Sequence, residues 1–141
     1  MFATIELAVE VPVYPERVFR AWLDGFEFTK ITRQPARIVP QVGGNLWLLG
    51  GEVTGIFRRL VPYSHLEMTW QIRGKTSSHA SQVEIRIEPT CTGSLFRVWH
   101  HGVDLSEVQN VLKWWEENFL RPLQAHFENL VGDYVADLSD G

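Results

Sequence analysis

The sequence predicts an α+β fold, in which a curved antiparallel β-sheet wraps around one long C-terminal α-helix, with two short helices after the first strand. Two observations carry this prediction. From residue 36 to residue 101, short strand-like segments alternate with turn residues such as Gly43-Gly44 and Pro62. A long helix-like stretch then begins near Ser106 and carries the aromatic residues Trp114, Trp115 and Phe119. So much aromatic bulk on one helix needs a wide concave surface to cover it, and a curled sheet provides one.

The N-terminal third reads as a strand followed by two helices. Over residues 5–11, apolar residues at every second position indicate a half-buried strand. Pro15 suits the first turn of a helix, where a missing N–H costs nothing. Asp24-Gly25 ends this helix, and residues 26–32 add one more short helical turn before Pro35. The apolar stripe of the first helix comprises Val18, Phe19, Trp22 and Leu23.

The central region reads as an antiparallel meander of short strands. Alternation is clearest in three of them, which present one apolar and one polar face each. Gly55, inside a predicted strand, indicates a bulge or a sharp bend that lets the sheet curl. The predicted strands cover residues 38–39, 46–49, 53–61, 66–72, 83–87 and 95–100.

The last helix is predicted from its end signals and its apolar face. Ser106 and Gln109 fit a capping box, and Gly132 is the expected C-terminal stop. Pro122 lies inside the helix and predicts a kink. The kink either bends the helix along the sheet, which we favour, or marks a flexible lid. The predicted apolar face holds Val108, Leu112, Trp115, Phe119, Leu123, His126 and Leu130.

Composition favours one small domain in residues 1–132 with a loose tail in 133–141. The formal charge of −4 and a pI near 5.7 argue against a nucleic-acid-binding surface. No apolar stretch approaches the ~20 residues that span a bilayer, and the N-terminus lacks a basic secretory start, so we expect a cytoplasmic protein without a membrane partner. Cys91 is the only cysteine and falls in a predicted turn, where we expect an exposed thiol.

The five histidines suggest neither a metal site nor a catalytic site. Zinc needs three or four converging ligands. His100 and His101 are neighbours on a predicted strand, so their side chains point to opposite faces. We therefore predict no metal, no cofactor and no catalytic residue, and interpret His100 and His126 as core or cavity-rim histidines. The full set is His65, His79, His100, His101 and His126.

Several segments, in order, resemble a known family. The matching residues are Tyr14-Pro15-Glu16-Arg17-Val18-Phe19, Val42-Gly43-Gly44, Gly51-Glu52-Val53-Thr54-Gly55-Ile56-Phe57, Leu60-Val61-Pro62, Trp70, His79, Ser94, His100-His101-Gly102-Val103 and Trp114-Trp115. From about Ile5 to Leu130 the chain resembles the homologues of the activator of the heat shock protein 90 ATPase, specifically that activator's C-terminal domain. The family belongs to the START-like, or birch-pollen-allergen-like, helix-grip superfamily (SRPBCC).

The resemblance implies the helix-grip fold and two further expectations. Tyr14 departs from the family pattern, which more often has a small polar helix cap before this proline. The two-domain eukaryotic activator has an additional N-terminal domain that engages the chaperone, and nothing in this sequence resembles it. We therefore expect little action on the chaperone by this chain alone.

We predict a non-enzymatic protein that binds a small apolar or aromatic molecule between the sheet and the last helix, as a monomer or weak homodimer. The alternative is a stress-response module that binds a heat shock protein 90-type chaperone and modulates its ATPase. A third possibility is a cyclase or hydrolase, as in some members of the superfamily. The predicted ligand-binding residues are Leu46, Phe57, Met68, Trp70, Val83, Ile85, Phe96, Val98, His100, Leu112, Trp115, Phe119 and His126.

Overall fold

In a computed structural model, seven strands form one antiparallel sheet in the order β1-β7-β6-β5-β4-β3-β2. The structure describes residues 1–74 and 81–139, with side chains described up to residue 133; His79 lies outside the described residues. The predicted fold class is confirmed. The strands are β1 (Phe2–Val11), β2 (Arg37–Ile38), β3 (Asn45–Leu48), β4 (Val53–Val61), β5 (His65–Ile72), β6 (Ser81–Pro89) and β7 (Ser94–Asp104).

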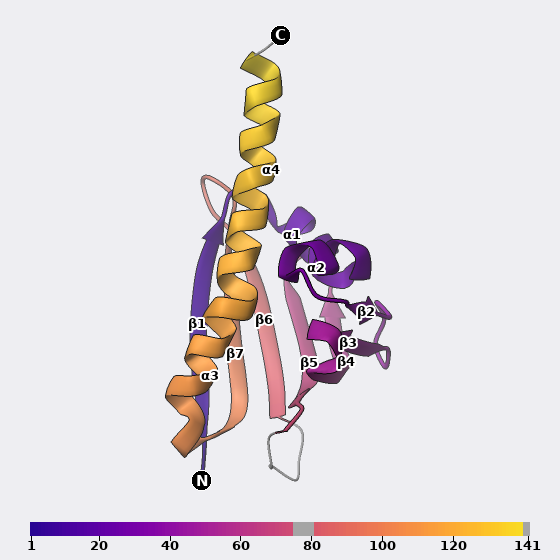
Figure 1. Cartoon of the computed structure of the whole chain (residues 1–141), viewed down its shortest axis with the longest axis vertical. Helices are drawn as coiled ribbons and strands as arrows, with labels where there is room; N and C mark the ends of the chain where they lie inside the picture. Colours follow the sequence, from indigo (N-terminus) through magenta and orange to yellow (C-terminus); the bar gives the residue numbers. More distant parts are fainter. Residues whose placement is uncertain (75–80, 140–141) are drawn as a thin grey trace.

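The helices lie on one side of this sheet (Figure 1). The last helix follows β1 and β7 along their length, and its end projects beyond the sheet, while α1 and α2 lie beside it. The helical segments are α1 (Pro15–Leu23), α2 (Gly25–Thr32), α3 (Val108–Trp115) and α4 (Arg121–Ser139), with short turns η1 (Leu49–Gly51), η2 (Leu105–Glu107) and η3 (Glu116–Leu120).

Strand register brings the apolar positions of neighbouring strands onto the helix-facing side. Met68 pairs with Val83, Val83 pairs with His100, and His100 pairs with Ile5. All four are buried. Because side chains alternate along a strand, the neighbouring polar residues line the opposite, convex face. The alternation predicted for these strands is therefore observed.

Gly55 marks a close approach of two strands rather than the bulge that the sequence predicts. A Cβ at this position would lie 2.0 Å from the Thr69 carbonyl oxygen of β5. The register shift between β4 and β5 falls between Phe57 and Arg59 instead. Beside Gly55, the Ile56 amide donates to the Thr69 hydroxyl at 2.9 Å. Glycine is needed here because any side chain would push β4 away from β5.

Asp24 connects the two short helices. Its backbone N–H closes the last turn of α1 by donating to the Ala21 carbonyl oxygen, and its carboxylate accepts the Phe26 and Glu27 amides at the start of α2. Tyr14 provides no side-chain cap to α1. The second helix spans Gly25–Thr32, within one residue of the predicted 26–32, and Asp24 satisfies its first free N–H groups.

Both predicted ends of the last helix need correction. At the N-terminal end, Asp104 rather than Ser106 provides a side-chain cap, to the short turn η2 that precedes α3: its carboxylate accepts hydrogen bonds from the Ser106 amide and hydroxyl at 2.9 and 2.7 Å. Gly132 does not stop the helix, which continues through residues 133–139, the segment predicted to be a loose tail. Glycine at C′ ends a helix when it adopts a left-handed conformation, and Gly132 does not have a positive φ.

The irregularity predicted at Pro122 lies one turn earlier, as the π-helical segment η3. There the Arg121 N–H donates to the Glu116 carbonyl oxygen, five residues back. A π turn inserts one extra residue into an α-helix, so the side chains that follow it are rotated about the helix axis. As a result Phe127 is fully buried, where the predicted face has His126, and Leu130 is 41% exposed. The core-facing residues of the helix are Val111, Trp115, Phe119, Leu120, Leu123 and Phe127.

The position of Trp115 leads to a stability prediction. Its side chain is fully buried and stacks on Trp70, with ring centroids 4.9 Å apart. We expect Trp115→Ala to lower the free energy of unfolding by roughly 3–5 kcal/mol, the usual cost of truncating a buried aromatic residue. Denaturant unfolding measures this, with Trp99→Ala on the convex face as the control. A loss below about 1 kcal/mol for Trp115→Ala would contradict a central role for Trp115.

Candidate functional site

Most of the predicted ligand-binding residues form the packed core between the sheet and the last helix. Their rings contact one another directly: Phe119 lies 5.6 Å from Trp70 and 4.9 Å from Trp115, centroid to centroid. Side chains in such contact leave no room for a ligand among them. The buried members are Leu46, Phe57, Met68, Trp70, Val83, Ile85, Phe96, Val98, His100, Trp115 and Phe119.

The remaining predicted residues lie elsewhere. Leu112 is half-buried at the edge of the core. His126 faces α2, where its Nε2 lies 2.9 Å from the Glu27 carboxylate. Trp114, which does not belong to the predicted apolar face of the last helix, is half-buried: its ring is 5.3 Å from that of Phe119, and its indole N–H donates to Glu52.

A cavity of about 220 Å³ lies at one end of the core. We call it the end cavity. Trp70 and His100 line it, so the structure brings these two predicted residues together at one site. The sequence analysis missed the rest of the lining, because the partners come from the ends of β5, β6 and β7 and the start of the last helix. These additional residues are Gln71, Ile72, Ser81, Gly102, Val103, Asp104, Ser106, Glu107 and Val111.

A directed chain of hydrogen bonds fixes the imidazole at this cavity. The Trp115 indole N–H donates to His100 Nδ1 at 3.0 Å. The Ser81 hydroxyl donates its only proton to the Trp70 carbonyl oxygen at 2.7 Å, and its oxygen lies 2.7 Å from His100 Nε2. Ser81 therefore accepts from this nitrogen, which places the proton of the neutral ring on Nε2.

This arrangement keeps His100 uncharged. Burial, with a smaller contribution from the charge of His101, lowers the pKa of His100 from 6.5 to about 4. Protonation would also place an N–H on Nδ1, opposite the N–H of Trp115, so that two donors would face each other. The site presents a neutral, fixed imidazole at neutral pH.

Trp70 contributes a polar atom without a partner. Its buried Nε1–H has no hydrogen-bond partner among the residues that the structure describes. A buried donor left unpaired costs about 1–3 kcal/mol. Trp70 also belongs to the lining of the end cavity.

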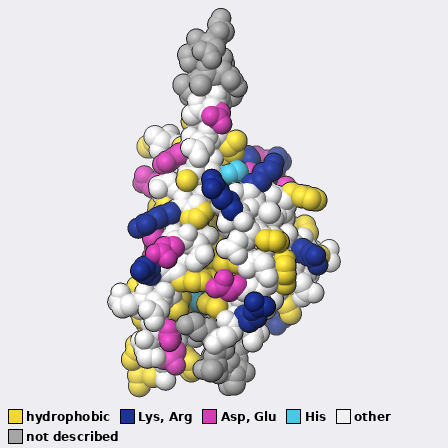
Figure 2. Space-filling view, viewed as in Figure 1, with side chains coloured by type: hydrophobic (Ala, Val, Ile, Leu, Met, Phe, Trp, Pro, Cys, Tyr) yellow, Lys and Arg dark blue, Asp and Glu magenta, His cyan; other side chains and the backbone are white. Residues whose placement is uncertain are grey.

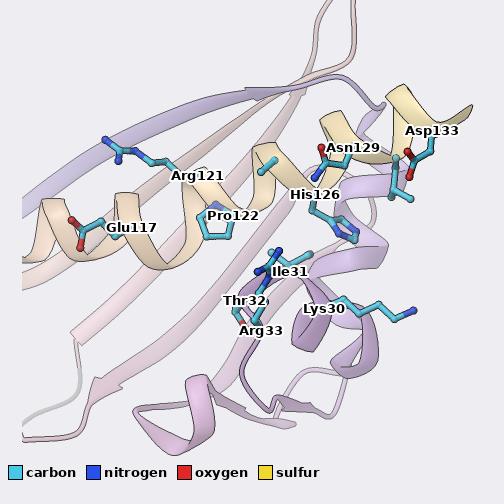
Figure 3. A pocket seen from close by; sticks show the side chains of 12 residues that line it. Lys30, Ile31, Thr32, Arg33, Glu117, Arg121, Pro122, His126, Asn129 and Asp133 are labelled. Atoms are coloured by element: carbon cyan, nitrogen blue, oxygen red, sulfur yellow. The ribbon is translucent and has the colours of Figure 1, made fainter. Parts of the chain in front are cut away.

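A second hollow, about 460 Å³, lies between α2 and α4 on the surface (Figure 3). We call it the helix groove. Figure 3 shows Lys30 and Arg121 directed away from one another, at opposite ends of the groove. Charged side chains of both signs also interleave across this face of the molecule (Figure 2). The groove is thus lined by side chains of both charges together with the apolar Pro122 and Leu130. It resembles a surface depression more than an enclosed ligand site.

One wall of the helix groove is held by a three-residue cluster. Arg17 binds the Glu27 carboxylate through two nitrogens, at 2.7 and 2.5 Å, and His126 contacts the same carboxylate. Burial acts to raise the pKa of Glu27, but hydrogen bonds and charge attraction from Arg17 and His126 outweigh it, so the pKa is lowered. The cluster joins α1, α2 and α4.

None of the described helices is long and apolar enough to cross a membrane.

The pKa of His100 predicts a pH-dependent stability. The unfolded chain takes up a proton on His100 near pH 6.5, whereas the folded protein does so only near pH 4. The stabilisation is therefore complete above pH 6.5 and is lost as the pH falls to 4, by about 3 kcal/mol. Unfolding measurements across this range test it, with His100→Gln as the reference that removes the effect. An NMR titration showing His100 protonated near pH 6 would contradict the assignment.

Comparisons with known proteins agree with the fold and identify the family. The family model described as "Activator of Hsp90 ATPase homolog 1-like protein" matches residues 12–128. The mouse "Activator of 90 kDa heat shock protein ATPase homolog 1" is 21% identical over 113 residues, which cover 80% of this chain and 33% of the relative. This chain thus spans about a third of the length of the curated relatives that it matches.

Solved structures share the same fold. A crystal structure of an HSP90 activator from Plasmodium falciparum has a TM-score of 0.77 at 20% identity, covering 86% of this chain and 94% of that one. The solution structure of the Aha1 dimer from Colwellia psychrerythraea has a TM-score of 0.73 at 16% identity, with 89% and 96% covered. The family match spans most of the chain, and this chain belongs to the family of Activator of Hsp90 ATPase homolog 1-like proteins.

Proposed function

We propose that this protein binds a small aromatic or apolar molecule in the end cavity and performs no chemistry on it. One observation carries the proposal: the 220 Å³ cavity is lined by Trp70, which has a buried N–H without a partner among the described residues. Ligand sites are mainly apolar, with a few polar groups that fix orientation. Trp70 and Val111 supply the apolar wall, and His100 and Ser81 supply fixed polar groups.

The volume limits the size of the ligand. An apolar cavity of roughly 150 Å³ accommodates benzene. The end cavity therefore suits a molecule of one ring or two fused rings that carries a hydrogen-bond acceptor. This is a smaller site than the sequence predicts, since Phe57, Met68 and Phe96 are buried in the core and do not line the cavity.

The hydrogen bonds of His100 argue against catalysis. A general base needs a free lone pair within reach of the substrate. Nδ1 already accepts from Trp115, and Nε2 already donates to Ser81. His100 therefore cannot abstract a proton from a ligand without losing a bond to its own protein. The imidazole of His100 therefore does not supply the base that the cyclase and hydrolase alternatives would require.

A ligand screen tests the proposal. One- and two-ring compounds with an acceptor should raise the melting temperature in proportion to ln(1 + [L]/Kd). In NMR titrations of the hits, the indole signals of Trp70 and Trp115 should shift more than those of Trp47 and Trp99.

A variant pair sharpens this test. Val111→Phe fills the end cavity and should abolish binding, whereas Val131→Phe, on the same helix but outside the cavity lining, should leave it intact. If Val111→Phe binds as tightly as the parent, or if the hits shift only Trp47 and Trp99, the ligand occupies another surface and the proposal fails.

The names of the relatives support a second candidate, a co-chaperone module; with it goes our expectation of a cytoplasmic protein that acts in a stress response. Both curated relatives are activators of the 90 kDa heat shock protein ATPase, and the Plasmodium falciparum neighbour is an HSP90 activator. The Colwellia psychrerythraea neighbour was solved as a dimer, which fits our expectation of a monomer or weak homodimer. This role would require a chaperone-binding surface, for which the helix groove is the candidate.

We expect this chain alone to stimulate the chaperone ATPase weakly, because it spans about a third of the curated activators. An ATPase assay with the cognate heat shock protein 90 decides this, with a two-domain activator as the positive control. Stimulation of several-fold at near-stoichiometric protein would place the co-chaperone role first.

A further inference from the structure

Three potential metal ligands meet on the convex face of the sheet, on the side opposite the end cavity. His65 opens β5, and Glu67 follows two residues later on the same face. Glu84 on β6 pairs directly with Glu67. The three ligand atoms all lie within 4.8 Å of one another. The spacing of the histidines alone gives no sign of these carboxylates, since strand pairing brings Glu84 to Glu67.

The spacing of these atoms suits a tetrahedral ion. His65 Nε2 lies 3.2 Å from Glu84 Oε1 and 3.5 Å from Glu67 Oε1. Zinc binds imidazole nitrogen and carboxylate oxygen at about 2.0–2.2 Å in tetrahedral geometry, which separates neighbouring ligand atoms by roughly 3.4 Å. The three side chains therefore approach ligand spacing without a change of backbone.

Two further observations favour a cation as a ligand of this cluster. His65 Nε2 is buried, yet it makes no hydrogen bond within the described part of the chain, although two carboxylates lie near it. Neither oxygen is placed to accept from the ring N–H. Glu67 and Glu84 also stand directly opposite each other on adjacent strands, which is destabilising for like charges. A metal ion on the Nε2 lone pair would satisfy the nitrogen and offset both charges.

We propose that His65, Glu67 and Glu84 bind a divalent transition-metal ion of the zinc type on the convex face. One imidazole and two carboxylates are donors that zinc accepts, and three protein ligands leave a fourth position for water. His65 is 12% exposed and Glu84 22%, so the ion would be partly shielded, with Glu67 on the solvent side at 38%.

Two neighbouring groups compete for Glu84. The Arg86 Nε lies 3.1 Å from the same Oε1 that faces His65. His101 Nε2 lies 3.9 Å from Oε2, and its Nδ1 bonds with the Thr4 hydroxyl. Arg86 therefore weakens the site by holding one lone pair of a ligand, and its removal should tighten metal binding.

A zinc titration of the full chain tests the proposal, in untagged protein carrying Cys91→Ser so that the exposed thiol contributes nothing. Competition with a chromophoric chelator gives the stoichiometry and the Kd. We expect one zinc ion per chain. His65→Gln and Glu84→Gln should each bind zinc more than about tenfold more weakly, since the loss of even an outer partner of a metal ligand lowers metal affinity by about 10–100-fold. Arg86→Gln should bind more tightly. His126→Gln, a histidine on α4 that contacts Glu27 and not this cluster, is the matched control and should change the Kd less than about threefold.

NMR of the parent protein gives an answer that does not depend on the folding of the variants. Zinc should shift the ring signals of His65 and leave those of His126 unchanged. The proposal is wrong if zinc binds with the same Kd in His65→Gln, if the His65 ring does not respond, or if no binding occurs below about 1 mM.

Discussion

The contact between Trp115 and the His100–Ser81–Trp70 chain joins the last helix to the sheet, and the other features depend on it. The indole of Trp115 stacks on Trp70 and also donates to His100. A buried aromatic residue contributes through its area, but only a directed hydrogen bond fixes the rotation of the helix. His100 is in turn hydrogen-bonded to Ser81, and Ser81 donates to the Trp70 carbonyl oxygen. These hydrogen bonds connect β7, β6 and β5, so the same interaction also holds the three strands in place.

This constraint explains why the end cavity has its position. The aromatic rings fill the middle of the interface, with Trp70, Trp115 and Phe119 in mutual contact. Beyond them the helix starts late, since Asp104 caps a short turn before α3 begins at Val108. The end cavity then lies between the ends of the strands and Val111. The fold leaves a small site bounded by groups that the hydrogen-bond chain has already oriented.

Periodicity predicted the strands, the first helices and the core residues, because burial acts on alternating or helical faces. It failed where a single local bond changed the pattern. The π turn before Pro122 moved the buried face from His126 to Phe127, and no residue spacing announces such a turn. The cavity partners Ser81 and Val111 come together only through strand register and helix placement. Trp70 and His100 could be predicted from the sequence because they belong to the core. Ser81 and Val111 could not, because only the folded arrangement brings them to the cavity.

The pairing of β5 with β6 carries two sites on opposite faces of the sheet. On the concave face it sets Ser81 against Trp70, and on the convex face it sets Glu84 against Glu67. A slip of one residue would exchange the faces and destroy both arrangements. The hydrogen-bond chain stabilises this register from the inside, whereas the facing carboxylates work against it from the outside. An ion shared by His65, Glu67 and Glu84 would replace the repulsion between the two carboxylates by attraction to the ion. It would thereby stabilise the strand register on which the end cavity depends.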